Sequence, residues 1–365
     1  MAFAMIAAAC SSGDADDTTT TAAAAPETTT TQAPAPPETT TTTEAAPDLG
    51  TAENPIKVLF VPSVDAQVIV SGGEVMAEAL KEATGYEFEV AVPTSYAATA
   101  EEMCAAPDKT MGFIPGLLYV LATDLCGVDV AFKAVRFGSS VYYTQFLVPR
   151  DSTVSSVDDL TDLTWAYPDA GSTSGFMVPT VMLTDSVVTV GETVEAGSHN
   201  AAALAVYNGD ADVGTTFYSA WVNYGDSGAS WDGTSADADI PADLVDSCAV
   251  NEDDRLFCGD LRVLDARASV RTEAPDIVQK VKIAFISPPI PNDTLSFGSE
   301  FPPAMRAEIE TALVAFAAEC DTDEECAWND SIGDQDFYGW TGIDPATDDE
   351  YDFIRSMVAV TGYTP

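Results

Sequence analysis

Apolar positions follow two alternating patterns from residue 56 onwards. Short runs that are apolar throughout, or at every second position, are typical of buried strands, and longer runs with apolar residues three and four apart are typical of helices. Their alternation predicts a mostly parallel sheet with helices on both faces. The predicted strands are residues 56–61, 86–92, 111–114, 130–137 and 142–148, and the predicted helices are residues 73–84, 95–104 and 117–125.

A second unit of the same kind begins near residue 150. We expect an α/β protein with two lobes and a ligand cleft between them, where the carboxyl ends of the strands meet. Residues 55–147 would form lobe 1, residues 148–265 would form lobe 2 with a surface insertion near 223–260, and residues 266–365 would return to lobe 1. Further predicted strands are residues 163–167, 210–216 and 261–265, and further helices are residues 176–183, 201–208, 274–285, 302–318 and 348–360.

The most informative stretch is the turn that follows the predicted strand at residues 163–167. Ser172, Thr173 and Ser174 lie there between Gly171 and Gly175, directly before a predicted helix. One hydroxyl is enough to cap a helix, so three in a row favour an anion site, since helix amides and hydroxyls both donate hydrogen bonds. The alternative is an ordinary N-cap.

A second turn has similar chemistry. His199, the only histidine in the chain, follows a Gly-Ser pair and opens the helix at residues 201–208. A lone histidine excludes His-rich zinc sites and the H-E-x-x-H motif. Its place at a turn favours a ligand contact over a structural role.

These two motifs, at this spacing, resemble those of the phosphate/phosphite/phosphonate-binding proteins of ABC importers. The resemblance extends from about Ile56 to Arg271. It implies the two-lobe periplasmic binding protein fold of type II, a small phosphorus oxyanion as ligand, an ABC permease as partner and no enzymatic activity. The ligand contacts that it implies are Ser172, Thr173, Ser174 and His199, with Tyr96 and Tyr119 from lobe 1.

Other functions remain open at this point. Tyr142 and Tyr143 are adjacent and point to opposite faces of a strand, so one of them can reach the cleft. Adjacent tyrosines also bind iron in ferric-ion binding proteins of related architecture. A cleft hydrolase based on His199 and a serine is a further alternative, although Thr173 occupies the central position of a would-be G-x-S-x-G elbow. A sensor or scaffold module is another.

Acidic residues bear on the ligand and on metals. Residues 215–219, at the end of a predicted strand, contain no acid that could hold an aminoalkyl group, which favours a compact anion such as phosphate, phosphite or methylphosphonate. The acidic clusters at residues 321–325 and 348–350 lack the spacing of an EF-hand, and we interpret them as solvated surface. We expect no metal and no cofactor.

Composition and the first residues indicate the compartment. The formal charge of −45, from 59 acidic and 14 basic residues, excludes nucleic acid as a partner. Residues 1–10 form a short apolar run that ends in Cys10, as in a lipoprotein signal, although the usual basic residues are missing and we interpret the start as placed too far downstream. A chance cysteine is the alternative. Residues 11–54, rich in Thr, Pro, Ala and Glu, read as a tether. The expected location is therefore the outer face of the membrane, with a lipid anchor on a monomer.

Six further cysteines fall into close pairs. An even set outside the cytoplasm predicts three local disulfides, none with the spacing of a zinc or redox motif. Pairing by proximity gives Cys104–Cys126, Cys248–Cys258 and Cys320–Cys326.

Overall fold

The computed structural model describes residues 48–226, 230–319, 326–334 and 337–363. The predicted signal, Cys10 and most of the tether lie outside these residues. All described residues belong to one compact unit, Pro47–Pro365. Among them, no helix is long and apolar enough to cross a membrane.

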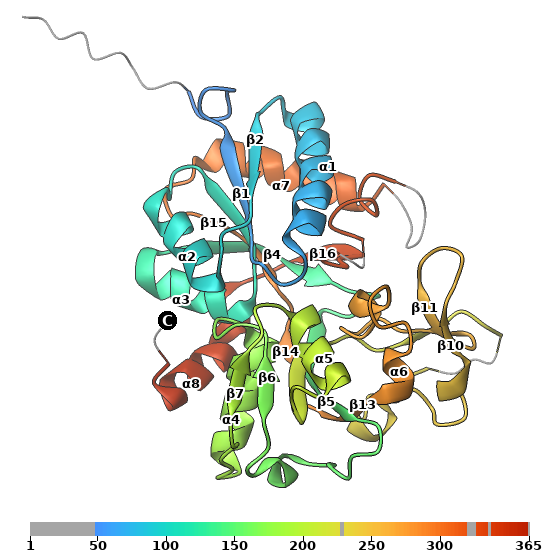
Figure 1. Cartoon of the computed structure of the whole chain (residues 1–365). Helices are drawn as coiled ribbons and strands as arrows, with labels where there is room; N and C mark the ends of the chain where they lie inside the picture. The colour runs from blue at the N-terminus through green and yellow to red at the C-terminus, as the bar shows by residue number, and fades with distance from the viewer. Residues whose placement is uncertain (1–47, 227–229, 320–325, 335–336, 364–365) are drawn as a thin grey trace, which may run out of the picture. The chain divides into compact units, whose positions relative to one another are not determined.

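Lobe 1 is built on a six-stranded sheet in the order β16-β4-β15-β3-β1-β2 (Figure 1). Strands β1 and β3 are buried almost throughout, because their apolar runs are covered on both faces. The sheet comprises β1 (Ile56–Phe60), β2 (Phe88–Ala91), β3 (Thr110–Ile114), β4 (Asp129–Val135), β15 (Thr294–Phe297) and β16 (Gly342–Pro345).

The helices of lobe 1 pack in pairs, α1 with α7 and α2 with α3 (Figure 1). The last helix, α8, contacts both α3 and the lobe 2 helix α4. Ser95 caps α2 as predicted, since its hydroxyl accepts from the amide of Ala98. The helices are α1 (Ala66–Thr84), α2 (Tyr96–Ala105), α3 (Gly116–Cys126), α7 (Pro303–Ala317) and α8 (Asp352–Thr361).

Helix α1 begins seven residues before the predicted start at Gly73. Asp65 caps it, with a carboxylate that accepts from the amides of Gln67 and Val68. The helix start was predicted too late because Gly72 and Gly73 lie inside the helix, and glycine usually marks a helix end. Here a Cβ on Gly72 would stand 2.4 Å from the ring of Phe337, so packing explains the glycine.

Lobe 2 is built on a second sheet in the order β13-β5-β8-β6-β7, with β14 paired to β5. Its strands are β5 (Val141–Pro149), β6 (Trp165–Tyr167), β7 (Thr193–Glu195), β8 (Val213–Tyr218), β13 (Val281–Ile286) and β14 (Ile290–Pro291). Its helices are the π-helical turn η2 (Thr173–Met177), α4 (Val178–Asp185), α5 (His199–Asn208) and α6 (Ile277–Lys280).

Both sheets are mixed, so the prediction of mostly parallel sheets was wrong. Among the described strands, the parallel pairs are β1–β2, β1–β3, β6–β7 and β6–β8. The chain enters lobe 2 through β5 and leaves it through β13 and β14, and both of these strands pair antiparallel with β5. Connections that pass between lobes do not have to follow the helical crossover that makes neighbouring strands parallel.

The observed strands place the lobe boundaries at other residues than those predicted. The second sheet begins at Val141 and its last strand, β14, ends at Pro291, so the chain changes sheet before residue 148 and again well after residue 265. The helix predicted for residues 274–285 is wrong beyond Lys280, where β13 begins. This segment alternates between buried and half-buried residues because it pairs with β5, and its short apolar run suits either structure.

The predicted insertion contains a small antiparallel sheet of its own. Its strands are β9 (Val222–Asn223), β10 (Cys248–Val250), β11 (Leu256–Cys258) and β12 (Leu261–Arg262). The predicted disulfides Cys104–Cys126 and Cys248–Cys258 are present. Cys326 is disulfide-bonded, and its predicted partner Cys320 lies outside the described residues. The remaining short helices are η1 (Val157–Leu160), η3 (Ser235–Asp237), η4 (Val245–Ser247), η5 (Ala268–Val270) and η6 (Asp348–Tyr351).

Candidate functional site

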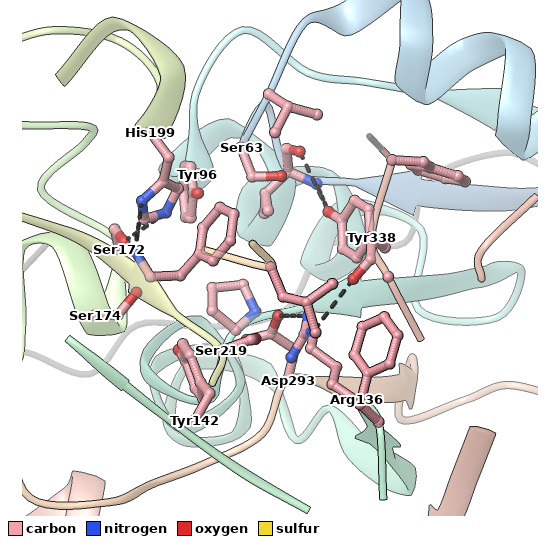
Figure 2. A pocket seen from close by; sticks show the side chains of 18 residues that line it. Ser63, Tyr96, Arg136, Tyr142, Ser172, Ser174, His199, Ser219, Asp293 and Tyr338 are labelled. Carbon is pink, nitrogen blue, oxygen red and sulfur yellow. Dashed lines mark hydrogen bonds and ion pairs between the residues drawn. The ribbon is translucent and has the colours of Figure 1, made fainter. Parts of the chain in front are cut away.

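A cavity of about 70 Å³ is lined by residues of both lobes. At about 10–15 Å³ for each water, it has room for roughly five waters or an ion of similar size. The predicted site residues Tyr96, Tyr142, Ser172, Ser174 and His199 line it (Figure 2). Polar residues that the sequence analysis did not select, Ser63, Arg136, Ser219, Asp293 and Tyr338, line it as well.

The hydroxyl turn is fixed from several sides. The hydroxyl of Ser172 accepts from the amide of Gly175 at 3.0 Å, and the hydroxyl of Thr144 donates to the carbonyl of Ser174 at 2.7 Å. A Cβ on Gly175 would stand 2.2 Å from the ring of Pro168, so the close approach requires glycine. The turn leads into the π-helical η2, a local geometry that is frequent at functional sites.

Thr173 does not line the cavity. Its hydroxyl oxygen accepts from the amide of Leu117, in lobe 1, at 2.9 Å. The side chain is fully buried and connects the two lobes. The predicted ligand contact is therefore an interlobe contact, because η2 turns its first residue away from the cavity.

His199 is a neutral hydrogen-bond donor. The amide of Phe217 donates to His199 Nδ1 at 3.3 Å, which leaves the ring proton on Nε2. Nε2 lies 3.4 Å from the hydroxyl of Ser172 and faces the cavity. Burial, and secondly the charge of Arg136, lower the pKa of His199 to about 3. The imidazole is therefore uncharged at neutral pH.

Two of the four predicted tyrosines line the cavity, and two do not. Burial raises the pKa values of Tyr96 and Tyr142, so their hydroxyls remain protonated and can donate. Tyr119 instead donates to Asp348. Tyr143 packs edge-on against Trp231 of the insertion, with ring centroids 5.2 Å apart. Residues 142 and 143 point to opposite sides of β5, as strand geometry requires.

Several helix amides near the cavity are already engaged within the protein. The amide of His199 donates to the carbonyl of Ser63 at 3.1 Å, and the amide of Ala201 donates to the hydroxyl of its N-cap, Ser198. The amide of Gly175 bonds to Ser172. The side chains of Ser172, Ser174 and His199 add donors at the cavity wall.

Arg136 adds a cation to the cavity wall. Its guanidinium bonds to Asp293 Oδ2 at 2.7 Å, to the side-chain oxygen of Asn292 at 2.9 Å and to the carbonyl of Tyr338 at 3.1 Å. Arg136 follows β4 directly, and Ser63 comes shortly after β1. The rule that ligands bind beyond the carboxyl ends of strands could have pointed to both residues. Asp293 and Tyr338 belong to no motif.

Within the described residues, no three His, Cys, Asp or Glu side chains are grouped so that they could hold a metal ion. Two carboxylates of the cluster at residues 348–350 form ion pairs within the protein: Glu350 pairs with Lys133 and Asp348 pairs with Arg355. The cluster at residues 321–325 lies outside the described residues.

Comparison with known families decides the class of protein. Residues 58–351 match the family described as "ABC transporter, phosphonate, periplasmic substrate-binding protein". The chain belongs to this family. The match covers both lobes, and the family is one of transport components that work outside the cytoplasm.

Individual relatives agree with this assignment. The phosphate-import protein PhnD of Mycolicibacterium smegmatis is 27% identical over 193 residues, which make up 47% of this chain and 58% of that protein. The match thus spans less than two thirds of that relative's length.

Solved structures establish the fold as that of type II periplasmic binding proteins. The binding component of an ABC phosphonate transporter from Pseudomonas aeruginosa aligns with a TM-score of 0.62 at 18% identity, over 84% of this chain and 86% of that one. PhnD1 from Prochlorococcus marinus, solved with methylphosphonate, aligns with a TM-score of 0.60 at 14% identity, over 84% of this chain and 98% of that one.

Proposed function

We propose that this protein captures a compact phosphorus oxyanion outside the cytoplasm and presents it to the permease of an ABC importer. One observation carries the proposal. Hydrogen-bond donors of both lobes converge on one small cavity, with Ser172, Ser174 and His199 on one side and Arg136 on the other (Figure 2). Such donors suit the oxygens of a tetrahedral anion. Closure of two lobes around the ligand is the established mode of periplasmic binding proteins.

The size of the cavity supports a compact ligand. About 70 Å³ suits phosphate, phosphite or methylphosphonate better than an anion with a long tail. The lack of an acid in residues 215–219 does not by itself disfavour an aminoalkyl ligand, because Asp293 lines the cavity. The preference for a compact anion now rests on the volume and on the pairing of Asp293 with Arg136.

Two of the alternative functions lack their key geometry. A ferric-ion site would need Tyr142 and Tyr143 together, and Tyr143 points away towards Trp231. A serine hydrolase would need His199 Nε2 to accept the proton of a serine. The bond from Phe217 to Nδ1 instead makes Nε2 the donor. The arrangement therefore favours binding over catalysis.

Calorimetry on the full chain tests the proposal, with phosphate, phosphite, methylphosphonate, aminoethylphosphonate and sulfate as ligands. We expect Tyr142→Phe to lower the affinity for the preferred phosphorus anion by about ten- to a hundred-fold, because a hydrogen bond to a charged group contributes about 1.5–3 kcal/mol. Tyr143→Phe is the matched control, since it removes the same hydroxyl from the neighbouring position, outside the cavity. Equal effects of the two substitutions, or no binding of any phosphorus anion, would contradict the proposal.

We also propose that Cys10 carries a lipid and that residues 11–54 tether the folded unit to the outer face of the membrane. The apolar run before Cys10 and the low-complexity segment after it support this location. Cys10→Ser is expected to move the protein from the membrane fraction to the soluble fraction of cells that express the gene with its upstream start. An unchanged distribution would argue against the anchor.

A further inference from the structure

An ion pair forms part of the cavity wall. Arg136 and Asp293 lie across the cavity from Ser172, Ser174 and His199 (Figure 2). Their side chains are only 14% and 15% exposed, and Arg136 Nη2 lies 2.7 Å from Asp293 Oδ2. An anion in this cavity therefore meets a buried cation and a buried carboxylate together.

Hydrogen bonds within the protein hold the guanidinium of Arg136 in place and do not use all of its N–H groups. Its contacts with Asn292, Asp293 and Tyr338 use three of the five N–H groups of an arginine. The ring of Tyr142 lies beside it, with the guanidinium carbon 5.7 Å from the ring centroid. Two N–H groups, one on each terminal nitrogen, are left for a ligand oxygen.

The carboxylate imposes a condition on the ligand. Asp293 Oδ2 receives the bond from Arg136, which leaves Oδ1 as an acceptor. Among the described residues that line the cavity, Asp293 is the only acid. An ionised carboxylate can only accept, so a bare ligand oxygen beside it would be repelled, whereas a ligand P–O–H group could donate to it.

We propose that the Arg136–Asp293 pair makes this site selective for oxyanions that retain an acidic proton, with Arg136 binding a ligand oxygen and Asp293 accepting the hydrogen bond of P–O–H. The inference rests on the proposed function, since it names the protonation state of the same ligand. Singly protonated phosphate and methylphosphonate satisfy the condition. Sulfate, which has no such proton at neutral pH, does not.

The groups that face Asp293 do not change charge between pH 6 and pH 9. Burial raises the pKa values of Tyr96 from α2, Tyr142 from β5, Tyr338 from the segment before β16 and Tyr351 from η6. The pKa of His199, from α5, is lowered to about 3, so its ring stays neutral. Arg136 remains a cation throughout. A change of affinity over this pH range therefore reports the protonation of the ligand.

The test is calorimetry on the full chain at pH 6 and pH 9. Methylphosphonate loses its second proton over this interval, and we expect its affinity to fall by about tenfold or more, the effect of losing one hydrogen bond to a charged group. Dimethylphosphinate, an anion of similar size without P–O–H, should bind about tenfold more weakly than methylphosphonate at pH 6 and show no change at pH 9. Sulfate should be rejected at both values.

Asp293→Asn should remove this discrimination. The amide can donate to a bare oxygen, so we expect equal affinities for methylphosphonate at pH 6 and pH 9 and an increase of at least about tenfold for sulfate. Asp129→Asn is the matched control. It also removes a carboxylate paired with an arginine, Arg306, but on the surface of lobe 1, and it should leave every affinity unchanged.

The outcomes separate the inference from the function on which it rests. No binding of any phosphorus anion by the unaltered chain would defeat the proposed function itself. Methylphosphonate binding that is equal or tighter at pH 9, with sulfate accepted, would overturn the inference alone. Tighter binding of aminoethylphosphonate than of methylphosphonate, lost in Asp293→Asn, would assign the carboxylate to an ammonium group and would also overturn it.

Discussion

Arg267→Met is expected to lower the free energy of unfolding by about 3–5 kcal/mol, the usual cost of removing one partner of a buried ion pair. The side chain of Arg267 is fully buried. It bonds to Asp265 at 3.0 Å, to Asp239 of the insertion at 2.6 Å and to the carbonyl of Val281 at 3.3 Å, and thereby connects the insertion to β13. Methionine fills a similar volume but leaves Asp265, itself 4% exposed, without its cation. Urea unfolding followed by circular dichroism measures the effect.

Lys280→Met provides the control for this substitution. Lys280 also pairs with an aspartate, Asp276, but both side chains are about half exposed, so the stability should not change measurably. The double variant Arg267→Met/Asp265→Asn should recover part of the lost stability, since residue 265 then no longer carries an unpaired negative charge. A loss below about 1 kcal/mol in Arg267→Met would show that water or a rearrangement compensates the two aspartates.

Arg136→Met is expected to weaken binding of the phosphorus anion by about 2–5 kcal/mol, or roughly thirty-fold to several thousand-fold. The substitution removes the only Lys or Arg side chain that lines the cavity among the described residues. It also leaves Asp293 as an uncompensated negative charge beside an anion. Both consequences act in the same direction, so the loss should exceed that of Tyr142→Phe. Calorimetry at pH 6, with the unfolding midpoint as a check on folding, measures it.

A double variant distinguishes these two contributions. In Arg136→Met/Asp293→Asn the repelling carboxylate is gone, and we expect about tenfold of the lost affinity to return. If the loss of affinity in the double variant equals the sum of the losses in the two single variants, the residues act independently. That result would contradict the reading of Arg136 and Asp293 as one unit of the site.

The sequence predicted the elements that local chemistry determines. Ser172, Ser174 and His199 follow strands and open helices or helical turns, so their neighbours in sequence are enough to bring them to the cleft edge. Strand alternation placed Tyr142 and Tyr143 on opposite faces, and the structure shows which face is the cavity. The helix capped by Ser95 and the disulfides between nearby cysteines could be predicted for the same reason.

Other features depend on tertiary structure and have no local signal. The hydroxyl of Thr173 looks like its neighbours in sequence, but η2 directs it to Leu117. Asp293 and Arg136 are 157 residues apart, and they meet because β15 inserts beside β4 in the first sheet. In the sequence Gly72 resembles a helix end, and only the close approach of the Phe337 ring shows why a glycine lies inside the helix. Segments distant in sequence can be brought together only by the whole topology.

Two hydrogen bonds that join the lobes beside the cavity consist mainly of main-chain atoms. One runs from the amide of His199 to the carbonyl of Ser63, and the other from the amide of Leu117 to the hydroxyl of Thr173. Three of these four atoms are present whatever the side chains are. Substitutions in the lining of the cavity can therefore change the ligand that it accepts while these two bonds are preserved, provided that residue 173 keeps its hydroxyl.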